Sequence, residues 1–188
     1  MKESSRGKRS RPAAAAALFA ALTAVAAFVR IPLPVVPLTL QTAVVLLSGL
    51  LLGARYGAMS QVVYIIIGLM GVPVFAQGGG PGYIVNPTFG YLCGFVGGAA
   101  VAGALVGDWK RAGTVRLLLS MTAGLAVIYF CGLAYFYWNI NFFQGKEVSF
   151  MKVVKTGFLV FIPGDAVKIA LLLPIISILK KRDVTLGV

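Results

Sequence analysis

The chain has 188 residues, of which 59% are apolar and only 12% are charged, and its formal net charge is +12. A soluble domain of ordinary composition carries about 25% charged residues. This composition therefore argues against a soluble globular enzyme, a disordered tail and a nucleic-acid-binding module. The mean hydropathy of +0.92 is instead typical of a protein that lies within a lipid bilayer.

The absence of histidine and the positions of the cysteines narrow the possible chemistry further. The chain contains no histidine, which argues against histidine-based zinc or haem sites, serine–histidine catalysis and histidine pH switches. Its two cysteines, Cys93 and Cys131, lie far apart inside apolar runs, as small buried side chains do. We expect no cofactor and no bound metal.

Six apolar runs predict six membrane-spanning helices, although the second run is shorter than the roughly 17 to 25 residues that a span requires. Proline- and glycine-rich segments separate several of the runs. We therefore expect an all-α membrane protein with a basic tail (1–12), a single six-helix membrane domain (13–180) and a second tail (181–188). The runs cover residues 13–29, 38–52, 56–72, 87–106, 117–138 and 163–179.

The basic residues predict the orientation. With six spans, the side that holds both termini carries twelve Lys and Arg and the other side carries four. Cytoplasmic loops are enriched in Lys and Arg, so both termini are predicted to be cytoplasmic, and the positive charge requires no nucleic acid. Residues 146–162 are predicted to form a short amphipathic helix on the outer surface. The four outer basic residues are Arg30, Lys146, Lys152 and Lys155.

Asp165 and Lys168 are the most informative pair, because they lie inside the last apolar run. An ionisable group at the centre of a membrane helix costs about 3 kcal/mol. The i, i+3 spacing places both on one helical face, and Pro163 places Asp165 in the first turn, where the helix dipole favours a carboxylate. The pair is either a structural ion pair or part of a polar ligand site.

Two more polar positions fall on the outer side. Asn86 precedes Pro87 at the start of the fourth run, where its side chain is suited either to capping the helix or to binding a ligand. Gln41 begins the second run, where it either binds a ligand or joins helices. Together with Asp165 and Lys168, these residues converge at one depth near the outer leaflet.

Small residues form two helix-packing patterns. Gly90, Gly94 and Gly98 repeat every fourth position and indicate close packing inside the bundle. The first run is rich in alanines at similar spacing, which favours an interface with another membrane protein. The interface alanines are predicted to be Ala13, Ala16, Ala17, Ala20 and Ala24.

Several motifs, taken in order, resemble the biotin-specific substrate-binding subunit of energy-coupling-factor transporters, the BioY family. The resemblance covers about residues 13–179 and is specific as a set. The motifs are the segments 34–42, 50–57, 71–75 with the following glycine loop, 86–91 and 162–168.

The resemblance implies a compact bundle of six helices in the plasma membrane of a prokaryote, which binds biotin from outside. It also implies docking onto a transmembrane coupling subunit and two cytoplasmic ATPases. The family's polar ligand residues correspond to Asp165 and Lys168 and to Asn86, with Gln41 and Tyr91 as further candidates. The first-helix contact with the coupling subunit corresponds to the alanine face.

Biotin suits these residues. Its ureido ring offers N–H donors to a carboxylate and a carbonyl acceptor to a lysine, and its apolar parts require apolar walls. The sequence contains no phosphate-binding loop, so any ATP hydrolysis belongs to partners and the chain is not expected to be an enzyme. The alternatives are a subunit for another vitamin and a proton-coupled carrier that uses Asp165.

Overall fold

The computed structural model describes residues 4–33 and 36–182, and most of these residues are helical. The sequence did not predict a short antiparallel ribbon, in which Arg30 pairs with Thr39 and Ile31 with Leu38. The helices are α1 (Ser4–Phe28), α2 (Gln41–Leu69), α3 (Phe89–Val106), α4 (Thr114–Trp138), α5 (Phe150–Gly157) and α6 (Ile162–Lys181), and the strands are β1 (Arg30–Ile31) and β2 (Leu38–Thr39).

Five helical stretches of the described residues are long and apolar enough to cross a membrane, whereas the sequence predicted six spans. The first, third and fourth stretches follow the predicted runs closely. The predicted short helix within residues 146–162 is present as α5, and Phe158 separates it from the 3-10 turn that leads into α6. The stretches are Arg11–Phe28, Gln41–Leu69, Phe89–Val106, Thr114–Phe143 and Phe150–Lys181.

The difference lies in α2, which is broken at Gly53. This residue has φ 71° and ψ 176°, a conformation that is essentially restricted to glycine. The break brings Gly57 against Gly49, since a Cβ on Gly57 would lie 2.7 Å from the Gly49 Cα. The predicted second and third runs are therefore two arms of one bent element. The first arm is only about 18 Å long, too short for a bilayer core of about 30 Å.

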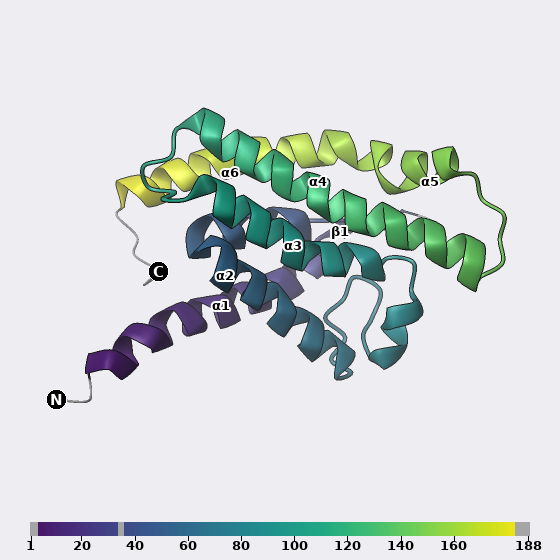
Figure 1. Ribbon diagram of the computed structural model, residues 1–188, viewed down its shortest axis with the longest axis horizontal. Coiled ribbons are helices and arrows are strands. Elements are labelled where there is room, and N and C mark those ends of the chain that lie inside the picture. Colours follow the sequence, from purple (N-terminus) through teal and green to yellow (C-terminus); the bar gives the residue numbers. More distant parts are fainter. Residues whose placement is uncertain (1–3, 34–35, 183–188) are drawn as a thin grey trace.

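Glycines set the packing of the central layer, in which α3 lies between α2 and α4 (Figure 1). Gly94 and Gly98 leave room for Ile128 of α4, and Gly90 leaves room for Tyr135. The predicted internal role of the repeated glycines is thus confirmed. On the other face of α3, Gly103 packs directly against the backbone at the bend of α2.

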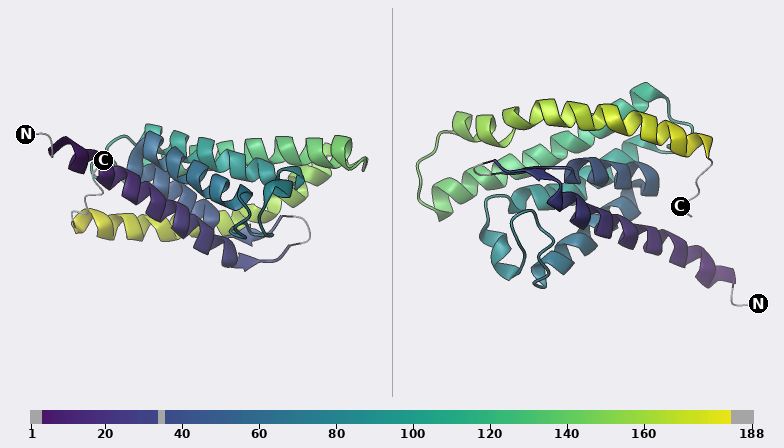
Figure 2. Two further views of the ribbon diagram at one scale, coloured as in Figure 1. Left: turned by 90° about the horizontal axis from the view of Figure 1, so that it is seen from below. Right: turned by 180° about the vertical axis from the view of Figure 1, so that it is seen from behind.

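The start of α1 and the end of α6 lie at the same end of the molecule, and the end of α6 lies beside the α3–α4 connection (Figures 1 and 2). A hydrogen bond of 2.6 Å from the Lys180 ammonium to the Ala112 carbonyl ties α6 to that connection. The predicted basic tail is helical from Ser4 onward, and residues 183–188 of the other tail lie outside the described residues.

We expect Gly103→Ala to destabilise the fold, because the new methyl group would collide with backbone atoms of Gly49, Gly53 and Ala54. Backbone atoms cannot rotate away, so the overpacking should lower the free energy of unfolding by about 1–3 kcal/mol. A lowered thermal unfolding temperature in detergent would show it. The matched control is Gly113→Ala, where φ is −70° and no atom lies within 4 Å of the new methyl. Equal melting of both variants would contradict the packing described here.

Candidate ligand-binding site

A cavity lies where the start of α2, the middle of α4 and the start of α6 meet the ribbon strand β2 and the start of α3. Its walls are mostly apolar, and its polar groups come from four separate parts of the chain. This combination is typical of a small-molecule site. The lining residues are Val36, Pro37, Leu38, Thr39, Gln41, Thr42, Ala76, Tyr83, Thr88, Tyr91, Leu92, Phe95, Ile128, Tyr129, Phe161, Asp165 and Lys168.

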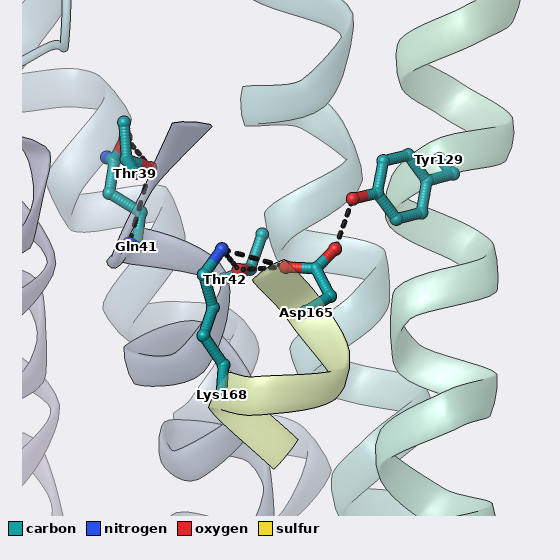
Figure 3. Close-up of polar contacts among 6 residues, drawn as sticks. All are labelled: Thr39, Gln41, Thr42, Tyr129, Asp165 and Lys168. Carbon is teal, nitrogen blue, oxygen red and sulfur yellow. Dashed lines mark hydrogen bonds and ion pairs between the residues drawn. The ribbon is translucent and has the colours of Figure 1, made fainter. Parts of the chain in front are cut away.

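Asp165 is the centre of the polar cluster, and only 4% of its surface is exposed. The Lys168 ammonium lies 2.7 Å from Asp165 Oδ1 and donates a second hydrogen bond of 2.9 Å to the Thr42 hydroxyl. Thr42 in turn donates to Asp165 Oδ1 at 3.1 Å. The Tyr129 hydroxyl donates to Asp165 Oδ2 from the opposite side (Figure 3). The carboxylate is thus held by three side chains from three helices.

Local sequence explains why the carboxylate is here. Pro163 lies in the first turn of α6 and Asp165 follows it in the same turn, so the dipole and the free N–H groups of the helix start stabilise the negative charge. Lys168 follows one turn later and neutralises it. The pair can therefore be buried, provided that its remaining hydrogen-bonding capacity is satisfied. Thr42 and Tyr129 supply two of the hydrogen bonds that this requires.

A second polar chain borders the cavity. The Gln41 amide donates to the Tyr64 hydroxyl at 2.6 Å, and Tyr64 donates to the Val74 carbonyl at 3.1 Å. This chain ties the start of α2 to the segment after its end, and it leaves the side chain of Gln41 buried beside the cavity. The joining role that the sequence allowed for Gln41 is therefore present, and its position also suits contact with a ligand.

Four of the five predicted ligand residues line the cavity, namely Asp165, Lys168, Gln41 and Tyr91. The Tyr91 hydroxyl donates a hydrogen bond of 2.8 Å to the Gly157 carbonyl, so Tyr91 presents mainly its ring to the cavity. Asn86 is not among the lining residues. Its carboxamide oxygen accepts from the backbone N–H and the hydroxyl of Thr88, at 2.9 and 2.8 Å.

The predicted cap at Asn86 requires a correction. The helix begins at Phe89 rather than at Pro87, and Thr88 is its first flanking residue. Asn86 therefore closes a turn three residues before the first residue of the helix. That turn orients Thr88, whose hydroxyl lies 2.9 Å from the hydroxyl of Tyr83.

Two residues of the polar cluster, Thr42 and Tyr129, were not predicted. Thr42 directly follows Gln41 at the polar start of the second apolar run. Its hydroxyl group and its position could therefore have identified it as a candidate ligand residue. Tyr129 lies in the middle of a long apolar run, where an aromatic side chain normally packs against lipid or other helices. Only the approach of α6 to α4 makes it a partner of Asp165.

The structure also divides the predicted alanine interface. Ala16 and Ala20 are buried, with 1% and 3% exposure, and Ala16 packs beside Leu51 and Leu52 of α2. Ala13 and Ala17 are exposed and Ala24 is half-buried. Ala16 and Ala20 are therefore not accessible to a partner, because they form the contact that holds α1 on α2.

The chain matches the sequence model of the BioY family over residues 1–183. It is 46% identical over 149 residues to a probable biotin transporter BioY of Lysinibacillus sphaericus, which covers 79% of this chain and 76% of that protein. It is 39% identical over 170 residues to the biotin transporter BioY of Thermotoga maritima, which covers 90% of this chain and 95% of that protein.

The fold is similar to a crystal structure of the S-component for biotin from an ECF-type ABC transporter. The TM-score is 0.80, with 23% sequence identity, and the likeness covers 96% of this chain and 95% of the other. It extends over nearly the whole length of both chains.

We expect the charges of Asp165 and Lys168 to be coupled in stability. Lys168→Met leaves a buried carboxylate without its counter-ion, which costs about 3–5 kcal/mol. Adding Asp165→Asn removes that charge and should restore part of the loss. Thermal unfolding of both single variants and the double variant in detergent measures the coupling. Strictly additive losses would mean that the two charges do not stabilise each other.

Proposed function

The chain belongs to the BioY family, and we propose that it is the biotin-binding subunit of an energy-coupling-factor importer. The observation that carries this proposal is the buried cluster of Asp165, Lys168 and Thr42 on one wall of a cavity whose walls are mostly apolar. The family relatives named as biotin transporters support the choice of ligand. The protein acts by binding and release rather than by catalysis.

The chemistry of the cluster fits the head of biotin. A ureido N–H donates to the carboxylate of Asp165, and the ureido carbonyl accepts from the ammonium of Lys168. Both contacts are charge-assisted and lie in a region of low dielectric, where such hydrogen bonds are strong. The apolar side chains of Leu92, Phe95 and Ile128 suit the sulfur ring and the hydrocarbon chain.

Biotin enters from the outer side of the membrane, and both chain termini are cytoplasmic. The uneven distribution of Lys and Arg supports this orientation. The two helix ends that carry the chain's termini lie at one end of the molecule (Figure 1), and the glycine-rich segment 77–82 lies toward the other. The cavity is bordered by residues close to that second end, among them Ala76 and Tyr83.

Inward release requires partners, namely a transmembrane coupling subunit and two cytoplasmic ATPases, since the sequence has no phosphate-binding loop of its own. We place the coupling subunit on the exposed face of α1. This face carries small side chains at Ala13 and Ala17, which allow a partner helix to approach closely.

Asp165→Ala should weaken biotin binding by about 5- to 150-fold, which corresponds to the roughly 1–3 kcal/mol lost with one buried acceptor. Titration calorimetry on purified protein in detergent measures the effect. Asp108→Ala is the matched control, because Asp108 is an exposed aspartate on the α3–α4 connection. Unchanged affinity in a folded Asp165 variant would reduce the residue to a structural role, and failure of the wild type to bind biotin would refute the proposed function.

Ala17→Trp should block uptake of biotin in cells that contain the whole transporter, while biotin binding by the isolated subunit stays normal. The indole would hold the partner helix away from α1. Ala134→Trp is the control, since Ala134 is also exposed but lies near the outer end of α4. Ala20→Trp should instead lower the yield of folded protein, because Ala20 is buried. Normal uptake with Ala17→Trp would move the docking surface elsewhere.

A further inference from the structure

The charges around the cavity leave one part of the ligand unaccounted for. Among the described residues that line the cavity, only Asp165 and Lys168 are charged, and they neutralise each other at 2.7 Å. Biotin, the ligand of the proposed function on which this inference rests, ends in a carboxylate at neutral pH. A carboxylate buried without a counter-ion is strongly disfavoured. The tail must therefore reach a cation elsewhere or extend to water.

Arg30 lies where such a cation is needed. It pairs directly with Thr39 in the ribbon of β1 and β2, and directly opposed residues of an antiparallel pair project from the same face with Cβ atoms about 4.5–5.5 Å apart. Thr39 lines the cavity. The side chain of Arg30 is therefore carried beside a lining residue, at the rim formed by the ribbon.

The electrostatic surroundings of Tyr83 agree with this placement of Arg30. Burial raises the pKa of Tyr83, and the positive charge of Arg30 acts in the opposite direction on that pKa. Tyr83 lines the cavity and comes from a different segment of the chain, residues 81–85. The charge of Arg30 thus acts on a group at the cavity wall.

Arg30 is also available. The residue is exposed, and within the part of the chain that the structure describes its guanidinium makes no hydrogen bond or ion pair. Guanidinium groups bind carboxylates through two parallel hydrogen bonds. By contrast, the lysine inside the cavity already has a carboxylate partner.

We propose that Arg30 binds the carboxylate tail of the ligand at the rim of the cavity and so selects for an acidic tail. The buried cluster then recognises the polar head, and Arg30 recognises the charge at the other end of the molecule. Since the two contacts are separate, the head sets most of the affinity and the rim sets the preference between free acid and neutral derivatives.

The test compares biotin with biotinamide, in which the tail is uncharged but close in size. Wild-type protein and Arg30→Gln are titrated with each ligand in detergent. We expect Arg30→Gln to weaken the binding of biotin by about 3- to 10-fold, as for a partly exposed charge-assisted contact. The affinity for biotinamide should stay unchanged. The effect on biotin should shrink as salt is raised, because exposed charges are screened. Arg55→Gln, a basic residue near the bend of α2, is the control.

Each other outcome overturns the inference. Equal weakening of both ligands would mean that Arg30 maintains the ribbon rather than binding the tail. No change for either ligand would mean that the tail extends to water and that Arg30 serves only as an outer basic residue at the membrane interface. If Lys168→Met weakened the binding of biotin but not that of biotinamide, the carboxylate tail would be bound by Lys168 instead. If wild-type protein binds neither ligand, it is the proposed function that fails.

Discussion

The structure depends on keeping one carboxylate inside an apolar protein. Asp165 is nearly fully buried and lies in a helix of high apolar content, where a lone negative charge would be very unfavourable. It is tolerated because Lys168, Thr42 and Tyr129 surround it and because α6 begins at that point. These partners belong to α6, α2 and α4, so the same interaction that satisfies the charge also positions three helices around the cavity.

This dependence explains why α6 is held differently from the central layer. The interfaces of α3 with α2 and α4 are dense and rest on glycines that admit a neighbouring backbone. In the most apolar 18-residue segment of the span formed by α5 and α6, only 22% of the residues are buried inside the protein. The corresponding share for α3 is 56%. α6 is attached to the bundle by the buried side chains of Leu172 and Ile176 and by two polar contacts, the Asp165 cluster and the Lys180 hydrogen bond. A ligand that binds the cluster acts on the least packed helix of the bundle.

The first helix shows how one small-residue pattern is divided between a buried face and an exposed face. Consecutive residues of a helix lie about 100° apart around its axis, so Ala16 packs on α2 while its neighbour Ala17 is exposed. A helix with small side chains all round has the same pattern on each face, and no face is marked as internal. The register of the internal contact is decided by the bend of α2, which brings Leu51 and Leu52 against α1.

The sequence by itself determined that this is a helical membrane protein with a charged pair in its last helix, because composition and unpaired intramembrane charge have strong energetic consequences. It also identified the glycines of α3 as internal, and it named four residues that line the cavity, two of them from their charge inside an apolar run. Tertiary structure alone decided that Tyr129 joins Asp165, that Asn86 lies outside the cavity lining and that two predicted spans are arms of one helix bent at Gly53. An aromatic residue in an apolar run gives no sign of its partner, and a single glycine does not reveal its backbone angles, because both depend on which helices pack together.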